Sequence, residues 1–155
     1  MNQIILLDAF PLSQVAHPKI KPETESWLSS LSKTKTVLKV PEIADYELRR
    51  ELLRLGNEES LKRLDEFVND VGLISITRET MKEAAELWAW VRKKGKPTAP
   101  DLSLDADVIL ASQAVLQLKR FDKSIVITSN LKHISRFCYK GIEVLDWYKT
   151  LENLT

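Results

Sequence analysis

The sequence has few of the features that mark disulfide-rich, fibrous or membrane-spanning proteins. Cys138 is the single cysteine among 155 residues, so no disulfide can form within the chain, and no Cys/His spacing is typical of a zinc site. Four glycines and six prolines are too few for fibrous or low-complexity proteins. No apolar run approaches the roughly 20 residues of a membrane helix, and the run from Ile4 to Leu7 is too short for a signal peptide. We therefore expect a cytoplasmic protein.

The chain also lacks an excess of either charge. It contains 23 basic and 22 acidic residues, so it lacks the overall positive charge that is typical of nucleic-acid-binding proteins. Any binding of nucleic acid must come from local basic patches or from metal ions. An apolar content of 44% is ordinary for a globular protein. The length favours one domain over residues 1–155, long enough to bury a core.

Short apolar segments alternate with segments of helical periodicity along the whole chain. Because this alternation is typical of parallel sheets covered by helices, we predict an α/β fold with a central parallel sheet of about five strands flanked by helices. The strands are expected at 3–7, 36–40, 72–77, 124–128 and 141–145, and the helices at 23–31, 41–55, 58–68, 78–94, 105–118 and 130–137.

Acidic residues stand where strands end and helices begin. Asp8 follows the first apolar strand, Asp107 lies in the first turn of the helix over 105–118, and Glu47 lies on a helix between them. Ligands bind beyond the carboxyl ends of parallel strands, where Asn130 and Thr128 at the end of the fourth strand also fall. Since carboxylate oxygens are preferred ligands of hard divalent cations, the three acids predict a metal site.

Each of these residues also has an ordinary structural interpretation. Asp105 is as readily an N-cap as a ligand, and the helix macrodipole favours Asp107 whatever its role. Glu42 and Asp45 share a helix with Glu47 and are the alternatives to it.

The same holds for the polar residues of the fourth strand and the helix that follows it. Asn130 after a strand is a common helix cap, Thr128 at a strand end usually satisfies local backbone, and His133 fits an ordinary helix surface.

Basic residues cluster in two places, and tryptophans occur at helical spacing. Charge runs are usually solvated, but the basic loop at 94–100, just before the acidic helix, is the best candidate to guide a nucleic-acid strand. The second cluster lies on the helix with Glu47. The tryptophans are more often core or interface than base-stacking groups. The cationic residues are Arg49, Arg50, Arg54, Arg92, Lys93, Lys94 and Lys96, and the tryptophans are Trp27, Trp88, Trp90 and Trp147.

These motifs together resemble PIN-domain ribonucleases, including toxins of the VapC type. The run Asp107-Val108-Ile109-Leu110-Ala111-Ser112-Gln113-Ala114 looks like the acidic helix start of that family, and its spacing to Thr128-Ser129-Asn130 fits. The apolar strand ending in Asp8 matches the first acid of the family, and Glu47-Leu48-Arg49-Arg50 matches the second. The resemblance spans Ile4 to Trp147, and the order and spacing of the motifs carry it.

The resemblance implies a three-layer PIN-like fold and a metal-dependent endoribonuclease. Asp8, Glu47 and Asp107 would hold Mg²⁺ or Mn²⁺, which activates water for in-line attack on an RNA phosphodiester, and Asn130 would complete the catalytic set. The chain departs from the family at Asn130, where an Asp is frequent and one negative charge is lost. The resemblance also implies a toxin paired with a protein antitoxin, and a homodimer.

A second functional class stays open. A PIN-like module that has lost its fourth acid at Asn130 would bind RNA or protein without cleaving anything. A phosphatase with Asp8 as nucleophile is set aside, because the general acid would be expected two residues later, where Phe10 stands.

Overall fold

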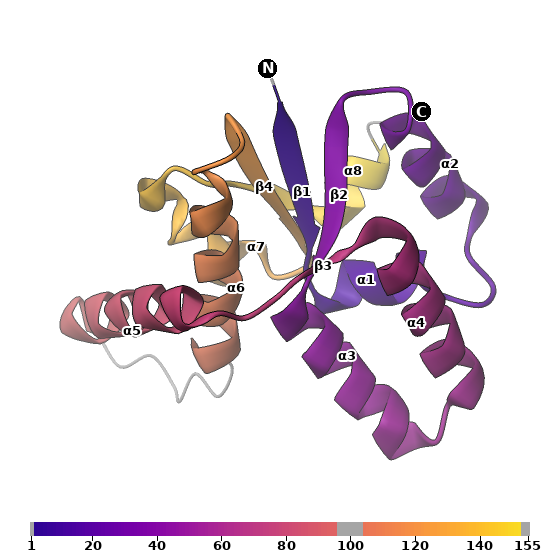
Figure 1. Cartoon of the computed structure of the whole chain (residues 1–155), viewed down its shortest axis with the longest axis horizontal. Coiled ribbons are helices and arrows are strands. Elements are labelled where there is room, and N and C mark those ends of the chain that lie inside the picture. The colour runs from indigo at the N-terminus through magenta and orange to yellow at the C-terminus, as the bar shows by residue number, and fades with distance from the viewer. Residues whose placement is uncertain (1, 96–103, 153–155) are drawn as a thin grey trace.

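The chain folds around a five-stranded sheet in which every strand pair is parallel. We describe residues 2–95 and 104–152 of a computed structural model, shown in Figure 1. The strand order is β3-β2-β1-β4-β5, so the first strand lies in the centre. The strands are β1 (Gln3–Leu7), β2 (Thr36–Pro41), β3 (Leu73–Ile74), β4 (Lys123–Thr128) and β5 (Glu143–Asp146).

Helices cover both faces of this sheet (Figure 1). They are α1 (Ala9–Val15), α2 (Pro22–Leu31), α3 (Glu42–Leu55), α4 (Glu58–Val71), α5 (Arg78–Lys93), α6 (Leu104–Gln117), α7 (Leu131–Ser135) and α8 (Trp147–Glu152), with a 3₁₀ turn at Cys138–Lys140. None of the helices within the described ranges is long and apolar enough to cross a membrane. The predicted α/β class, with its five-stranded parallel sheet flanked by helices, is confirmed.

Two apolar cores lie on opposite faces of the sheet. Ile4 and Leu6 point to one core, where α5, α6 and α7 pack, and Ile5 and Leu7 point to the other, which α1, α2, α4 and α8 cover. Alternate residues of a strand point to opposite faces, and a central parallel strand is buried on both. This explains the uninterrupted apolar run before Asp8.

The third strand is shorter than the predicted 72–77. Its backbone leaves the sheet because side chains satisfy the peptide groups: the carbonyl of Ile74 accepts from Nε2 of Gln113 at 2.6 Å, and the N–H of Ile76 donates to Oε1 of Glu42 at 2.7 Å. A peptide group bound by a side chain has no need of a neighbouring strand. The sequence pattern alone did not indicate these long-range partners.

Glycine and proline set several boundaries of helices and strands. Pro41 precedes α3, and Gly56 ends that helix in the left-handed conformation with φ of 66°, which glycine adopts without steric cost. Gly141, with φ of 99°, ends the 3₁₀ turn, so β5 begins at Glu143 and not at 141. Asn57 is the N-cap of α4, and its side-chain oxygen accepts from the N–H of Ser60.

Candidate functional site

Asp8 lies at the carboxyl end of the central strand, as predicted. Its Oδ1 accepts from the N–H of Ala9 at 2.8 Å and so caps α1, while its Oδ2 accepts from the hydroxyl of Thr128 at 2.7 Å. β1 and β4 are neighbours in register, with Leu7 opposite Ile127. The sheet therefore brings the residues that follow both strands to one edge, although they are 120 positions apart in sequence.

Thr128 joins three elements at this edge. Its side chain is fully buried. The hydroxyl donates to Asp8 and also accepts from the N–H of Asn130 at 2.9 Å. The sequence favoured a Thr128 hydroxyl that bonds only to nearby backbone, and the bond to the N–H of Asn130 is of that kind. The other bond is a long-range bond that orients the carboxylate of Asp8.

Glu47 lies on α3 within electrostatic reach of Asp8. Burial raises the pKa of the Glu47 carboxyl above its ordinary value, the negative charge of Asp8 raises it further, and Arg50 opposes the shift. The Glu47 side chain is 22% exposed, and Nη2 of Arg50 lies 4.0 Å from its Oε2. A carboxylate held in the field of a second carboxylate adds to a local negative potential, which attracts a cation.

The neighbouring acids of α3 bind other groups. Asp45 receives two hydrogen bonds from Arg49, at 3.0 and 3.1 Å, and Glu42 accepts from the backbone of Ile76. Of the three acids Glu42, Asp45 and Glu47, it is therefore Glu47 whose pKa is shifted by the charge of Asp8.

Asp107 lies in the first turn of α6, as predicted, and is buried. Its Oδ2 lies 3.5 Å from Nη2 of Arg136 and 3.9 Å from Nδ1 of His133, both on or just after α7. Asp105 is exposed and lies inside α6. The N-cap interpretation of Asp105 is wrong, because the buried Leu104 before it is already helical.

Asn130 occupies the N-cap position of α7, yet its side chain forms no capping hydrogen bond to that helix. Its backbone N–H is held by Thr128, and its carbonyl accepts from the N–H groups of His133 and Ile134. The backbone is therefore fixed at the edge of the sheet, whereas the amide does not serve as a cap. Its role in the site stays a prediction.

The donor set fits a magnesium ion only in part. Within residues 2–95 and 104–152, no three His, Cys, Asp or Glu side chains are grouped so that they could hold a metal ion together. Mg²⁺, however, is commonly bound by one or two carboxylates and several waters. Asp8 and Glu47 suit that mode, because their mutual repulsion is what a divalent cation would relieve. Asp107 faces cationic side chains.

Sequence reasoning missed Arg136 and set His133 aside as a surface residue. His133 is 45% exposed and Arg136 28% exposed, and both reach Asp107. The available signal was spacing: Asn130, His133 and Arg136 recur every three residues after a strand end, which places them near one side of a helical turn.

The basic residues on α3 are largely paired. Arg49 bridges Asp45 and Asp65, and Arg54 pairs with Glu51. The loop at 94–100, expected to guide a nucleic-acid strand, lies outside the described residues from position 96 onward.

The tryptophans divide between the core and the surface. Trp27 and Trp147 are buried and meet edge to face with ring centroids 5.5 Å apart, as expected of core residues. Trp90 stacks on Tyr139 at 4.2 Å, and the ammonium of Lys94 lies 4.4 Å from the Trp90 ring. Both neighbours occupy the aromatic surface of Trp90, which reduces its use for base stacking.

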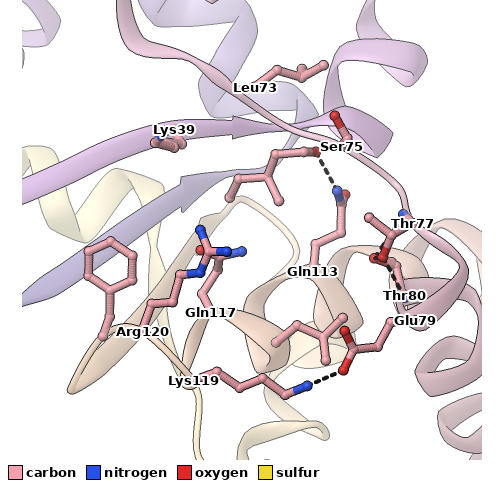
Figure 2. Close-up of a pocket in the computed structure, with 13 residues that line it drawn as sticks. Lys39, Leu73, Ser75, Thr77, Glu79, Thr80, Gln113, Gln117, Lys119 and Arg120 are labelled. Carbon is pink, nitrogen blue, oxygen red and sulfur yellow. Dashed lines mark hydrogen bonds and ion pairs between the residues drawn. The ribbon is translucent and has the colours of Figure 1, made fainter.

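A concave region lies away from these acids, beside β3 and the C-terminal half of α6 (Figure 2). Its volume is about 450 Å³. The buried Gln113 forms its wall and bonds to Ile74, and Glu79 is paired with Lys119. Glu79, the one carboxylate among the described residues that line this region, thus has a cationic partner. Among those residues the region contains no pair of neighbouring acids like Asp8 and Glu47.

Comparison with known proteins finds structures of the same fold but no similar sequence. No family model matches the sequence, and no curated protein matches it. Similar solved structures are complexes named VapBC. A chain of VapBC2 from Rickettsia felis, solved with a promoter DNA fragment, is 18% identical with a TM-score of 0.72, and the match covers 93% of this chain and 98% of that one.

Two further structures agree. A chain of DNA-bound VapBC from Salmonella typhimurium is 18% identical with a TM-score of 0.69, covering 95% of this chain and 99% of that one. A chain of VapBC-1 from nontypeable Haemophilus influenzae is 19% identical with a TM-score of 0.63, covering 94% and 98%. At such identities the likeness concerns the fold. The chain therefore has the fold of chains in VapBC complexes, in agreement with the PIN-like architecture that the sequence motifs implied.

Proposed function

We propose that the protein is a metal-dependent endoribonuclease and the toxin of a toxin–antitoxin pair. The observation that carries the proposal is a pair of acids at the carboxyl edge of the sheet: Thr128 orients the carboxylate of Asp8, and the half-buried Glu47 lies in its field. In parallel α/β folds this edge is where ligands bind. The VapBC likeness of the fold and the PIN-like order of the motifs both favour the same assignment.

The carboxylates have a definite task in this reaction. Asp8 and Glu47 would hold Mg²⁺ or Mn²⁺, which lowers the pKa of a bound water and offsets the charge that develops on the phosphate. Thr128 fixes the orientation of Asp8 through its hydroxyl. Asn130 is the fourth member of the proposed catalytic set, since its amide can orient a water molecule. Asp107 completes the set that the motifs imply, next to the cationic groups of α7.

The partners follow from the same comparison. Several of the similar solved structures are VapBC complexes, which supports an antitoxin that binds this chain and covers its acidic edge. A homodimer is compatible with apolar side chains left exposed on α5, namely Met81 and Trp88, which are 48% and 41% exposed. A cytoplasmic location would accord with a target in cellular RNA.

The test is cleavage of single-stranded RNA by the purified chain. We expect cleavage with Mg²⁺ or Mn²⁺, none with a chelator, and none for Asp8→Asn or Glu47→Gln. Glu51→Gln is the matched control, because Glu51 lies one turn further along α3, is exposed, and pairs with Arg54. Cleavage that persists in the chelator, or in both site variants, would reject the proposal.

The non-catalytic alternative rests on Asn130 and, within the described parts of the chain, on the incomplete grouping of acids. Calorimetric titration with Mn²⁺ separates the two functions. Heat of binding that disappears in Asp8→Asn supports the nuclease, whereas no heat from a folded wild-type chain favours a binding module.

A further inference from the structure

The three acids Asp8, Glu47 and Asp107 differ in how closely cationic side chains approach them. Glu47 lies in the field of Asp8, and its ion-pair partner Arg50 is exposed, with Nη2 4.0 Å from Oε2 of Glu47. Asp107, in contrast, has Arg136 at 3.5 Å and His133 at 3.9 Å. The negative charge available to a metal ion is therefore concentrated on the first pair, while the third acid already faces cationic groups.

Arg136 is held in place from two sides. Its guanidinium carbon lies 5.2 Å from the centroid of the Phe137 ring, and Phe137 is fully buried. Its Nη2 donates to Asp107, whose side chain is only 9% exposed. An arginine anchored on a ring and on a nearly buried carboxylate keeps its orientation, which lowers the entropy lost when the guanidinium binds a ligand.

The chemistry of this arrangement suits phosphate. A guanidinium carries five N–H donors, so it can contact a carboxylate and a phosphate at once, and its planar fork matches phosphate oxygens. α7 follows directly after Asn130, the position at which the chain lacks an acid. The segment that follows Asn130 thus places a permanent positive charge beside Asp107.

We propose that Arg136 is a phosphate-binding residue of the site, and that Asp107 is its positioning residue and not a ligand of the metal. The inference rests on the proposed ribonuclease function and refines it. RNA would be held by one metal ion on Asp8 and Glu47 and by one guanidinium on Asp107. The competing view is that the pair only fastens α7 to α6.

RNA binding in EDTA tests the first half of the proposal without any cleavage. Fluorescence anisotropy of a labelled single-stranded oligonucleotide is measured over a range of salt concentrations. Arg136→Gln should weaken binding about tenfold, the value of one charge-assisted contact, and lower the salt slope by about 0.7. Arg136→Lys should recover part of the affinity, because it keeps the charge and loses the fork. Lys132→Gln removes an exposed charge from α7, the helix that precedes Arg136, and should change neither quantity.

Mn²⁺ titration by calorimetry tests the second half. Asp107→Asn is isosteric and should leave the Mn²⁺ dissociation constant within about threefold of wild type, whereas Asp8→Asn should weaken it by about tenfold or more, since losing a nearby charge that does not touch the ion matters less than losing a ligand. Circular dichroism of each variant verifies that it is folded.

The outcomes separate this inference from the proposed function. Loss of Mn²⁺ binding in Asp107→Asn equal to that in Asp8→Asn would overturn the positioning role. Unchanged RNA affinity and salt slope in folded Arg136→Gln would overturn the phosphate contact and leave a purely structural pair. If wild type binds RNA and Mn²⁺ as described but cleaves nothing, the proposed function fails while the assignment of Arg136 stands. A wild type that binds no RNA overturns the assignment.

Discussion

Replacing Thr128 by valine removes one hydroxyl from the junction of three elements while keeping the shape of the side chain. The hydroxyl donates to Oδ2 of Asp8 at 2.7 Å and accepts from the N–H of Asn130 at 2.9 Å, and the side chain is fully buried. Water cannot replace the hydroxyl at a buried position without opening the junction. Both partners therefore lose a bond that solvent does not readily restore.

The magnitude follows from the two bonds. A hydrogen bond to a charged group contributes about 1.5–3 kcal/mol, and an unsatisfied N–H costs about 1–3 kcal/mol. Because Asn130 and Asp8 are half-buried and partly reached by water, we expect the free energy of unfolding to fall by about 2–4 kcal/mol in Thr128→Val. Thr128→Ser keeps both bonds and loses one buried methyl group, which costs about 1 kcal/mol.

Urea unfolding followed by tryptophan fluorescence measures the difference, since Trp27 and Trp147 are buried. The m-value should stay constant, so that the shift in midpoint reports stability. Thermal unfolding should show a melting temperature lower by several degrees, at about 2–4 °C per kcal/mol for a chain of this size. A valine variant whose midpoint equals or exceeds that of the serine variant would refute the reasoning.

A double-mutant cycle isolates the bond between the two side chains. Asp8→Ala and Thr128→Val should be non-additive by about 1–3 kcal/mol, as expected for residues in direct contact. A coupling energy near zero would mean that the hydroxyl stabilises the junction only through Asn130.

Three further predictions concern stability. Glu47→Gln should raise the free energy of unfolding at neutral pH by about 0.5–2 kcal/mol in metal-free buffer, because ionised Glu47 is penalised by burial and by Asp8. The folded-state pKa is raised, so wild type gains stability as pH falls through that pKa, and the advantage of the variant should shrink there. An advantage that grows on acidification would contradict this sign. Gly56→Ala should cost about 1 kcal/mol by urea unfolding, since φ is 66° and nothing crowds the added methyl. Gly56→Asn should cost less, and equal losses would mean that backbone strain is not the cause. Trp147→Ala should cost about 3–5 kcal/mol in the same assay, because its ring is buried against another tryptophan; a loss below about 1 kcal/mol would show that the site collapses around the cavity.

Much of the fold was predictable because its signals are local. Gln3–Leu7 is apolar at consecutive positions since a central parallel strand buries both faces, and Pro41 and Gly56 enclose α3 by their own backbone preferences. The length of β3 could not be predicted from local signals. It depends on Gln113 and Glu42, which bind the peptide groups at the end of the strand from distant parts of the chain.

The candidate site divides in the same way. The positions of Asp8 after β1 and Asp107 at the start of α6 follow from apolar periodicity that a sequence displays by itself. Their surroundings were decided by tertiary structure alone: the hydroxyl of Thr128 reaches Asp8 across 120 positions of sequence, Arg136 reaches Asp107 across 29, and the field of Asp8 acts on Glu47 from a different element. The pattern of a chain tells where a carboxylate stands along its own element. Which charge faces it depends on how strands are ordered in the sheet and how helices pack over them, and no local preference encodes that pairing.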